Sequence, residues 1–330
     1  MKLRDYKAVI TAGGIGTRLL PFSKEIPKEM FPIFASDENG SMRLKPLVQA
    51  IFEQLHSVGL RSFYFVVGRG KRAIEDHFSP DPRFLRYLES KGKLPSSLSE
   101  FYEKIRSSNI VFLNQPEPLG FGDAVLMGRP LIDEDFMVLA GDTLVLSNEN
   151  CHFTRLAEAH EKSEASATIL LQKVSNPTKY GVVEGTEIGE GVLRVKHAVE
   201  KPENPRSNWA IMPVYIFKSD IFEALSKTAL GRNGELQLTD AIERLVAMGE
   251  RVIGVKLKTD ELRLDLGSPE TIIEALKLSM IRGDTKLKLE STNAFENKSF
   301  TSPIDADDLD DLETPELTPL VSNRRKKIHV

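Results

Sequence analysis

The stretch AVITAGGIGTRLLPFSKEIPKEMFPI, residues 8–33, decides how the rest of the chain is interpreted. An apolar run that ends at Ala12 passes directly into a glycine cluster, which is typical of a buried strand followed by a tight turn. The cluster consists of Gly13, Gly14 and Gly16. Arg18 and Lys28 follow within the same stretch, and prolines stand close on both sides of Lys28. The sequence therefore places a sharp turn and two cations within reach of one another.

The glycine turn is suited to binding an anion. Glycine tolerates positive φ, and closely spaced backbone N–H groups form a concavity that binds phosphate. In an open parallel sheet, ligands bind beyond the C-terminal ends of the strands, which is where this turn is expected. The Walker pattern fails, because no Gly-Lys-Ser/Thr closes the loop. The dinucleotide pattern G-x-G-x-x-G fails at Leu19, and the acids Asp37 and Glu38 lie in a polar turn, which disfavours a standard dehydrogenase.

Composition narrows the class of protein further. The 330 residues carry a net charge of −4 and a pI of about 6.0, whereas nucleic-acid-binding proteins are strongly basic. Cys151 is the only cysteine, which excludes an intramolecular disulfide and a zinc site built on paired cysteines. No apolar run approaches the roughly 18 residues of a membrane span, and the N-terminal residues lack the apolar core of a signal peptide. We therefore expect a cytoplasmic protein that binds neither nucleic acid nor a membrane.

Apolar runs alternate with helical patterns along most of the chain. Strands are predicted at residues 7–14, 62–70, 109–114, 135–142, 167–174 and 209–219. Helices are predicted at residues 45–60, 71–78, 151–163, 234–249 and 268–281. This alternation predicts an α/β fold, and we expect a Rossmann-like mixed, mostly parallel sheet flanked by helices. Residues 1–283 are expected to form this domain.

Three segments depart from the alternation. Residues 179–205 contain short β segments with glycine turns and no helix, which predicts an antiparallel insertion. Residues 79–109 are polar and irregular, with a helix expected near 98–108, and are interpreted as a surface insertion. Residues 284–330 are acidic and then basic, with seven acids in the stretch DADDLDDLETPE. This composition predicts a flexible tail, and docking of that tail on another subunit or a partner is kept as an alternative.

The opening stretch resembles the motif of the sugar-1-phosphate nucleotidyltransferases. That motif is a Gly-Gly-x-Gly-Thr-Arg loop, a proline and a Pro-Lys-x-x-x-Pro segment, which stand here as Gly13 to Arg18, Pro21 and Pro27 to Pro32. The version with IPKEM is most similar to the bacterial and archaeal UTP–glucose-1-phosphate uridylyltransferase branch. Later motifs extend the resemblance, in the expected order, over residues 7–280. No hexapeptide repeat follows, which argues against the branches that carry a β-helix appendage.

The resemblance implies a nucleotide site around the glycine turn. Nucleotidyl transfer brings two polyanions together, so positioned positive charge does most of the catalytic work. Arg18 is implied to hold the leaving pyrophosphate, and Lys28 the α-phosphate. Gln115 corresponds to a glutamine that reads the base, and Gly120 to the glycine before the next helix. The remaining residues implied to contact the nucleotide are Ala12, Gly13, Gly14, Gly16 and Thr17.

The resemblance also implies a metal site and a sugar subsite. Asp142 ends a strand and Asp265 precedes a helix, and these two carboxylates are implied to hold Mg²⁺ against phosphate oxygens. Ser268 is the better candidate for the helix cap, which leaves Asp265 free for the metal. The sugar phosphate is implied to bind in the antiparallel insertion and at a following helix start, through Gly181, Glu200, Lys201 and Glu235.

These implications give one leading hypothesis and several alternatives. We expect transfer of a uridylyl group from UTP to glucose 1-phosphate, by in-line attack of the sugar phosphate on the α-phosphate with Mg²⁺, giving UDP-glucose and pyrophosphate. A thymidylyltransferase that uses dTTP is the nearest alternative, because uracil and thymine differ by one methyl, worth about 1 kcal/mol in a pocket. A non-catalytic sugar-nucleotide sensor and a dehydrogenase are alternatives from other classes. A homo-oligomer is expected from the habit of the family.

Overall fold

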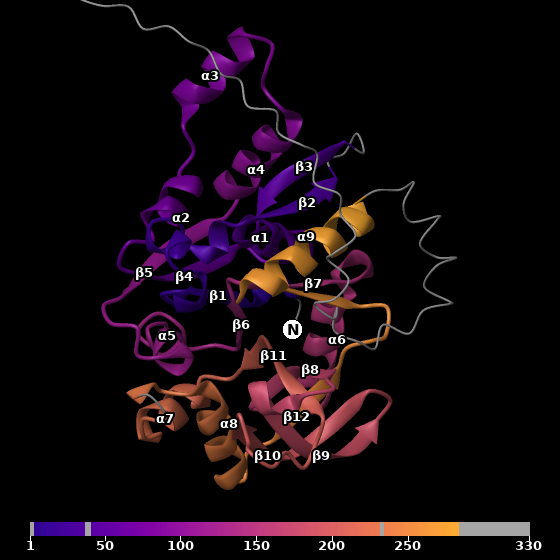
Figure 1. Cartoon of the computed structure of the whole chain (residues 1–330). Coiled ribbons are helices and arrows are strands. Elements are labelled where there is room, and N and C mark those ends of the chain that lie inside the picture. The colour runs from indigo at the N-terminus through magenta and orange to yellow at the C-terminus, as the bar shows by residue number, and fades with distance from the viewer. Residues whose placement is uncertain (1–2, 37–40, 232–233, 284–330) are drawn as a thin grey trace, which may run out of the picture.

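A computed structural model describes residues 3–36, 41–231 and 234–283 of the chain (Figure 1). The predicted tail at 284–330 lies outside the described residues. In the described ranges, every helix is too short or too polar to cross a lipid bilayer.

The described elements follow the predicted alternation of strands and helices. The strands are β1 (Lys7–Ala12), β2 (Pro32–Ser36), β3 (Met42–Pro46), β4 (Ser62–Gly68), β5 (Asn109–Gln115), β6 (Phe136–Ala140), β7 (Thr143–Leu146), β8 (Ala167–Lys173), β9 (Gly181–Gly189), β10 (Val192–Glu200), β11 (Trp209–Phe217), β12 (Val252–Lys256) and β13 (Leu262–Asp265). The helices are α1 (Leu47–Ser57), α2 (Arg72–His77), α3 (Pro82–Ser90), α4 (Ser96–Arg106), α5 (Phe121–Leu126), α6 (Cys151–Lys162), α7 (Asp220–Lys227), α8 (Leu238–Ala247) and α9 (Pro269–Gly283).

The central sheet of the described residues has nine strands in the order β5-β4-β1-β6-β11-β8-β12-β10-β9. The neighbours β5–β4, β4–β1, β1–β6 and β8–β12 are parallel. The remaining neighbours, β6–β11, β11–β8, β12–β10 and β10–β9, are antiparallel. The α/β class is therefore confirmed, and the sheet is mixed, with four parallel and four antiparallel neighbour pairs in this order. Outside the predicted antiparallel insertion, β11 runs against both of its neighbours. The strand order does not confirm a Rossmann-like sheet.

The sheet separates two hydrophobic cores. Successive side chains of a strand point to opposite faces, and in β1 Ala8 and Ile10 face one core while Val9 faces the other. Helices α1, α4, α6 and α9 complete the first core, and α5, α7 and α8 complete the second (Figure 1). Burial on both faces explains why the central strands are continuous apolar runs in the sequence.

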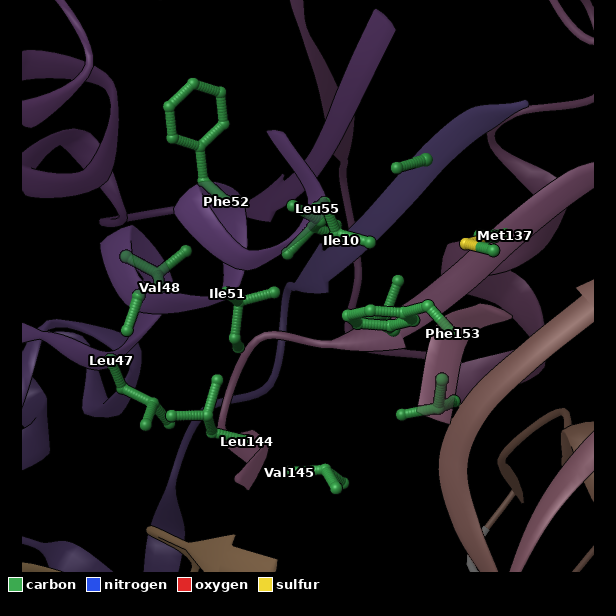
Figure 2. Close-up of a cluster of buried hydrophobic side chains, with 14 of the residues drawn as sticks. Ile10, Leu47, Val48, Ile51, Phe52, Leu55, Met137, Leu144, Val145 and Phe153 are labelled. Atoms are coloured by element: carbon green, nitrogen blue, oxygen red, sulfur yellow. The ribbon is translucent and has the colours of Figure 1, made fainter. Parts of the chain in front are cut away.

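Helix α1 anchors the strand that carries the glycine turn. Its predicted apolar residues are confirmed to lie in the first core, at Leu47, Val48, Ile51, Phe52 and Leu55. Figure 2 shows these side chains in one cluster with Ile10 of β1, with Leu55 next to Ile10. The ring centroids of Phe52 and Phe63 are 4.7 Å apart in an edge-on contact. Since full burial of each such side chain is worth about 1.5–3 kcal/mol, this packing fixes β1 firmly.

The segment 79–109 is more regular than its polar composition indicated. The helix predicted near 98–108 is confirmed as α4, which buries Phe101, Tyr102 and Ile105 in the first core. The description of the rest as irregular is wrong, because α3 forms from residue 82 onward and projects from the body of the protein (Figure 1). The Asp81 carboxylate caps α3 by accepting the N–H groups of residues 83 and 84, at 2.9 and 3.1 Å.

Short antiparallel pairs complete the fold. The antiparallel structure predicted at 179–205 is confirmed as β9 and β10, which extend one edge of the central sheet. Two further pairs, β2–β3 and β7–β13, form small separate sheets. The second pair matters most for the site, because β7 directly follows Asp142 and β13 ends at Asp265.

Candidate active site

The glycine turn lies directly against the ends of β4 and β5. Gly68, the last residue of β4, is in register with Gln115, the last residue of β5. A Cβ placed on Gly68 would stand 2.7 Å from the carbonyl oxygen of Gly13. A Cβ placed on Gly13 would stand 2.0 Å from Oε1 of Gln115, which is closer than atoms can approach. Glycine at these positions is therefore required for the close contact between the turn and Gln115.

Gln115 is buried and its amide group is held in one orientation. Its Nε2 donates to the carbonyl oxygen of Gly120 at 3.1 Å and to Oδ2 of Asp123 at 2.7 Å. Its Oε1 faces Gly13. Gly120 has φ +109°, and a Cβ there would stand 2.8 Å from the carbonyl oxygen of Leu236, so the position is confined to glycine. The arrangement presents an acceptor oxygen beside the glycine turn.

A pocket of about 340 Å³ opens beside this turn. Three residues predicted to bind the nucleotide line it, namely Gly13, Gly14 and Gln115. Three cations also line it, namely Lys24, Arg69 and Lys71. The other residues predicted to contact the nucleotide, Ala12, Gly16, Thr17 and Gly120, are not among its lining residues. The pocket thus combines backbone amides, one fixed amide side chain and positive charge, which suits a phosphorylated ligand.

Lys28 forms an ion pair with Asp142, although 114 residues separate them in sequence. Lys28 begins a short 3₁₀ turn after Pro27, and Asp142 follows β6. Burial alone lowers the pKa of the Lys28 ammonium, but the carboxylates of Asp142 and Glu29 outweigh burial and hold that pKa above its ordinary value. Burial alone raises the pKa of the Asp142 carboxyl, but Lys28 outweighs it and holds that pKa below its ordinary value. Both groups are therefore charged at neutral pH.

Asp265 lies beside this pair because β13 and β7 are in register. Asp265 is opposite Thr143 in that pairing, and the N–H of Leu266 donates to the carbonyl oxygen of Asp142 at 3.0 Å. The carboxylate Oδ1 of Asp265 accepts the N–H of Gly267 at 2.6 Å. A Cβ placed on Gly267 would stand 2.9 Å from Nη2 of Arg18, which puts this second predicted cation at the same place. Four of the predicted residues, Arg18, Lys28, Asp142 and Asp265, are thus brought together.

The oxygen ligands around Asp142 fit a hard divalent cation whose coordination shell a bound substrate would complete. Mg²⁺ is held in proteins by one or two carboxylates together with phosphate oxygens and water. Asp142 and Asp265 supply two carboxylates at neighbouring positions of a strand pair. Within the described residues, no three His, Cys, Asp or Glu side chains gather as a metal cluster. The residues therefore fit an ion that shares its ligands with a polyphosphate better than an ion held by protein alone.

Three of the predicted sugar residues form one cluster at the start of β9 and the end of β10. Gly181 pairs with Glu200, and a Cβ on Gly181 would stand 3.0 Å from Oε2 of Glu200. That Oε2 accepts the hydroxyl of Thr239 at 2.7 Å, and Oε1 lies 2.9 Å from Nζ of Lys201. Lys201 has φ +44°, a conformation that L residues rarely adopt, and its side chain is half exposed. The cluster offers one carboxylate and one cation to a ligand.

Glu235, the fourth predicted sugar residue, lies beside Gly120, which is a predicted nucleotide residue. A Cβ on Gly120 would stand 3.0 Å from Cβ of Glu235. Its Oε2 accepts Nε2 of Gln237 at 3.1 Å. Glu235 belongs to the segment that leads into α8, and it thus lies beside the start of α5 at Gly120.

The structure adds a buried ion pair that the sequence analysis did not identify. Nζ of Lys71 donates to Oε2 of Glu29 at 2.8 Å, and both side chains are buried. Glu29 is the residue after Lys28, and Lys71 lines the pocket. Burial raises the pKa of the Glu29 carboxyl, and Lys71 and Lys28 only partly offset this. Lys71 follows closely after the end of β4, as other site residues follow the ends of their strands, and that signal could have identified it.

Comparison with known proteins identifies the family of this chain. The profile of the family described as Nucleotidyl transferase matches residues 7–280. The chain belongs to the nucleotidyl transferase family. The matched range of this nucleotidyl transferase contains every residue of the site described above.

Named relatives and solved structures resemble most of this nucleotidyl transferase. The UTP–glucose-1-phosphate uridylyltransferase of Pseudomonas aeruginosa is 36% identical over 276 residues, 82% of this chain and 94% of the relative. The Bacillus subtilis (strain 168) protein of the same name is 38% identical over 247 residues, 72% of this chain and 80% of the relative. A crystal structure of UDP-glucose pyrophosphorylase complexed with UDP-glucose is 33% identical, with a TM-score of 0.71 over 84% of this chain and 99% of that chain. UTP-bound UGPase from Acinetobacter baumannii is 26% identical, with a TM-score of 0.72 over 89% and 99%.

Proposed function

We propose that this nucleotidyl transferase transfers the uridylyl group of UTP to glucose 1-phosphate, and that residues 1–283 form the domain that does so. The observation that carries the proposal is the meeting of the Gly13–Gln115 contact with the Lys28–Asp142 pair and Asp265 at the strand ends. The relatives named for UTP and glucose 1-phosphate, and the solved structures holding UTP or UDP-glucose, support these substrates.

The proposed reaction exchanges one phosphoanhydride bond at the α-phosphorus of UTP for another. A phosphate oxygen of glucose 1-phosphate attacks the α-phosphorus of UTP, and a new P–O bond forms. The bond from the α-phosphorus to the oxygen bridging to the β-phosphate breaks in line with the attack, and pyrophosphate leaves with that electron pair. Because nucleophile and leaving group are both phosphate anions, the protein's task is to position charge and stabilise it rather than to move protons.

The predicted residues divide this task among them. In this proposal Oε1 of Gln115 accepts the N3–H of uracil, which is supported by the hydrogen bond that Nε2 of Gln115 already donates to Asp123. Lys28, which stays charged at neutral pH, compensates charge on the α-phosphate, and Arg18 offers a planar fork to the leaving pyrophosphate. Held by Asp142 and Asp265, Mg²⁺ would neutralise charge on the phosphate oxygens. The sugar phosphate is assigned to Gly181, Glu200, Lys201 and Glu235.

A substrate panel tests this proposal. Pyrophosphate release is measured with glucose 1-phosphate and each of UTP, dTTP, ATP and CTP, in the presence of Mg²⁺. We expect turnover with UTP, and turnover with dTTP alone would replace the proposal by the thymidylyltransferase alternative. Absence of turnover with all four, combined with binding of UDP-glucose, would favour the sugar-nucleotide sensor.

The role of Lys28 is tested by Lys28→Met. We expect kcat/KM to fall by at least about 10²-fold, the usual effect of removing one preorganised charge or donor from a reacting centre. Lys24→Met is the matched control, because Lys24 is a lysine of the same stretch whose side chain is 76% exposed and pairs with Glu25 rather than with Asp142. Retained turnover in Lys28→Met, with the fold intact by circular dichroism, would show that the reaction centre lies elsewhere.

A further inference from the structure

Arg263 connects the metal residues to the sugar residues. It stands on β13 two positions before Asp265, so both side chains lie on the same face of the strand. Nη2 of Arg263 donates to Oδ2 of Asp265 at 2.5 Å. The side chain is largely buried, at 12% exposure. Sequence analysis gave Arg263 no role.

The other side of the same guanidinium lies on an aromatic ring. Cζ of Arg263 is 5.1 Å from the centroid of the Tyr180 ring, which is within the range of a cation–π contact. Nη1 is directed to the sulfur of Met212 at 3.5 Å, on the central strand β11. One planar group is therefore held by a carboxylate, a ring and a core side chain.

Tyr180 belongs to the cluster that carries the sugar residues. Its carbonyl oxygen accepts the N–H of Lys201 at 3.0 Å, and it directly precedes Gly181. The position of the Tyr180 ring therefore affects the backbone at both Gly181 and Lys201. Because Arg263 contacts both the Tyr180 ring and Asp265, it connects Gly181 and Lys201 to Asp265 through Tyr180.

The two partners of Asp265 fix the plane of its carboxylate. Oδ1 accepts the N–H of Gly267 at 2.6 Å, and Oδ2 accepts Arg263 at 2.5 Å. Each oxygen keeps lone pairs that these bonds do not use. Groups that orient a metal-binding carboxylate in this way commonly matter for metal affinity almost as much as the ligand itself.

We propose that Arg263 is a positioning residue, which orients Asp265 for the divalent cation and, through Tyr180, sets the distance between the cation and the sugar-phosphate residues. The proposal rests on the function proposed above, because it assigns Asp265 to the cation and Gly181, Glu200 and Lys201 to the sugar phosphate. An ion pair that only stabilised the fold would affect neither metal affinity nor the KM of one substrate selectively.

Three variants separate the two contacts of Arg263. These are the hydrogen bond to Asp265, here called the Asp265 arm, and the contact with the Tyr180 ring, here called the Tyr180 arm. Mn²⁺ binding to the protein with UTP present is followed by electron paramagnetic resonance, and KM is measured for UTP and for glucose 1-phosphate. Arg263→Met removes both arms, so Mn²⁺ affinity is expected to fall about 10- to 100-fold. The KM for glucose 1-phosphate is expected to rise about threefold to tenfold, with less change in the KM for UTP. Arg263→Lys is expected to recover Mn²⁺ affinity but not the KM for glucose 1-phosphate, and Tyr180→Leu to raise only that KM.

Arg155→Met is the matched control. Arg155 forms a two-bond ion pair with Glu261, at 2.6 and 2.7 Å, and is part-buried like Arg263. We expect this control to lower thermal stability while leaving Mn²⁺ affinity and both KM values unchanged. Unchanged Mn²⁺ affinity in Arg263→Met, or equal effects in Arg263→Met and Arg155→Met, would overturn the proposal. Wild-type protein that releases no pyrophosphate from UTP and glucose 1-phosphate would instead contradict the proposed function, while Mn²⁺ binding would still test the Asp265 arm.

Discussion

Replacing Lys71 by Met is expected to destabilise the protein by about 3–5 kcal/mol at pH 8, the usual cost of leaving one partner of a buried ion pair alone. Nζ of Lys71 and Oε2 of Glu29 are 2.8 Å apart, and the two side chains are 8% and 1% exposed. Water therefore cannot replace the lost ammonium. Burial already raises the pKa of Glu29, and Lys71 is the strongest influence that opposes this rise.

The loss of stability in Lys71→Met is expected to depend on pH. The pKa of Glu29 in the folded protein lies above the unfolded value of about 4.3, so the folded state keeps its proton to higher pH than the unfolded state does. Stability from this group is therefore complete below the unfolded pKa and falls as pH rises through the folded pKa. Without Lys71, the pKa of Glu29 in the folded protein rises further. Lys71→Met is therefore expected to lose less stability at pH 5 than at pH 8.

Urea unfolding at pH 5 and pH 8 measures this effect. The double variant Glu29→Gln with Lys71→Met removes the stranded charge and is expected to be more stable at pH 8 than Lys71→Met alone. Lys227→Met is the control, because its ion pair with Glu223 has both side chains 57% exposed and should contribute less than about 1 kcal/mol. A loss below about 1 kcal/mol for Lys71→Met at pH 8, or an equal loss at both pH values, would refute the reasoning.

Three further substitutions follow from the same site. Gly13→Ala places a Cβ against Oε1 of Gln115, so the KM for UTP in steady-state kinetics is expected to rise about tenfold, as for one lost hydrogen bond, with the fold retained by circular dichroism. Gly120→Ala meets both a φ of +109° and the Leu236 carbonyl, and thermal unfolding is expected to show a loss of about 1–3 kcal/mol. The depressed pKa of Asp142 contributes stability that is present above its unfolded pKa and lost as pH falls, so Asp142→Asn should lower stability at pH 7 and flatten acid unfolding below pH 5. An acid limb as steep as that of the wild type would contradict this last expectation.

Much of the fold could be predicted because its signals are local. The apolar spacing of α1 and the run that forms β1 each depend on neighbouring residues, and both predictions are confirmed. Strand direction is not a local property. The run that forms β11 is equally apolar in a parallel or antiparallel setting, so its reversal between β6 and β8 could not be predicted. The helix α3 was missed because it fully buries none of its residues and contacts the first core only through the partly buried Leu85.

Residues of the candidate site were predicted where they belong to a local sequence motif. They were missed where their role depends on contacts with residues that are distant in sequence. Asp142 was identified because it ends a predicted strand and Asp265 because it precedes a predicted helix in the family motif, and the β7–β13 pairing brings them together. Glu29 stands inside the same motif as Lys28, yet its contact with Lys71 depends on the packing of α2 and is not visible in sequence. Arg263 has an ordinary strand position, and only its distances to Asp265 and Tyr180 distinguish it. The roles proposed for the nucleotide and sugar residues stay predictions until ligands are bound.

Because Gly13 has no side chain, the residues allowed at positions 13 and 115 depend on each other, although these positions are far apart in sequence. Any group larger than hydrogen at residue 13 requires the Gln115 side chain to move away or to be replaced by a shorter one. A shorter side chain there would in turn leave the Asp123 carboxylate without the amide that now donates to it. Under the base-reading role proposed for Gln115, a change of base preference at this position therefore involves residues 13, 115 and 123 together, because their contacts depend on one another.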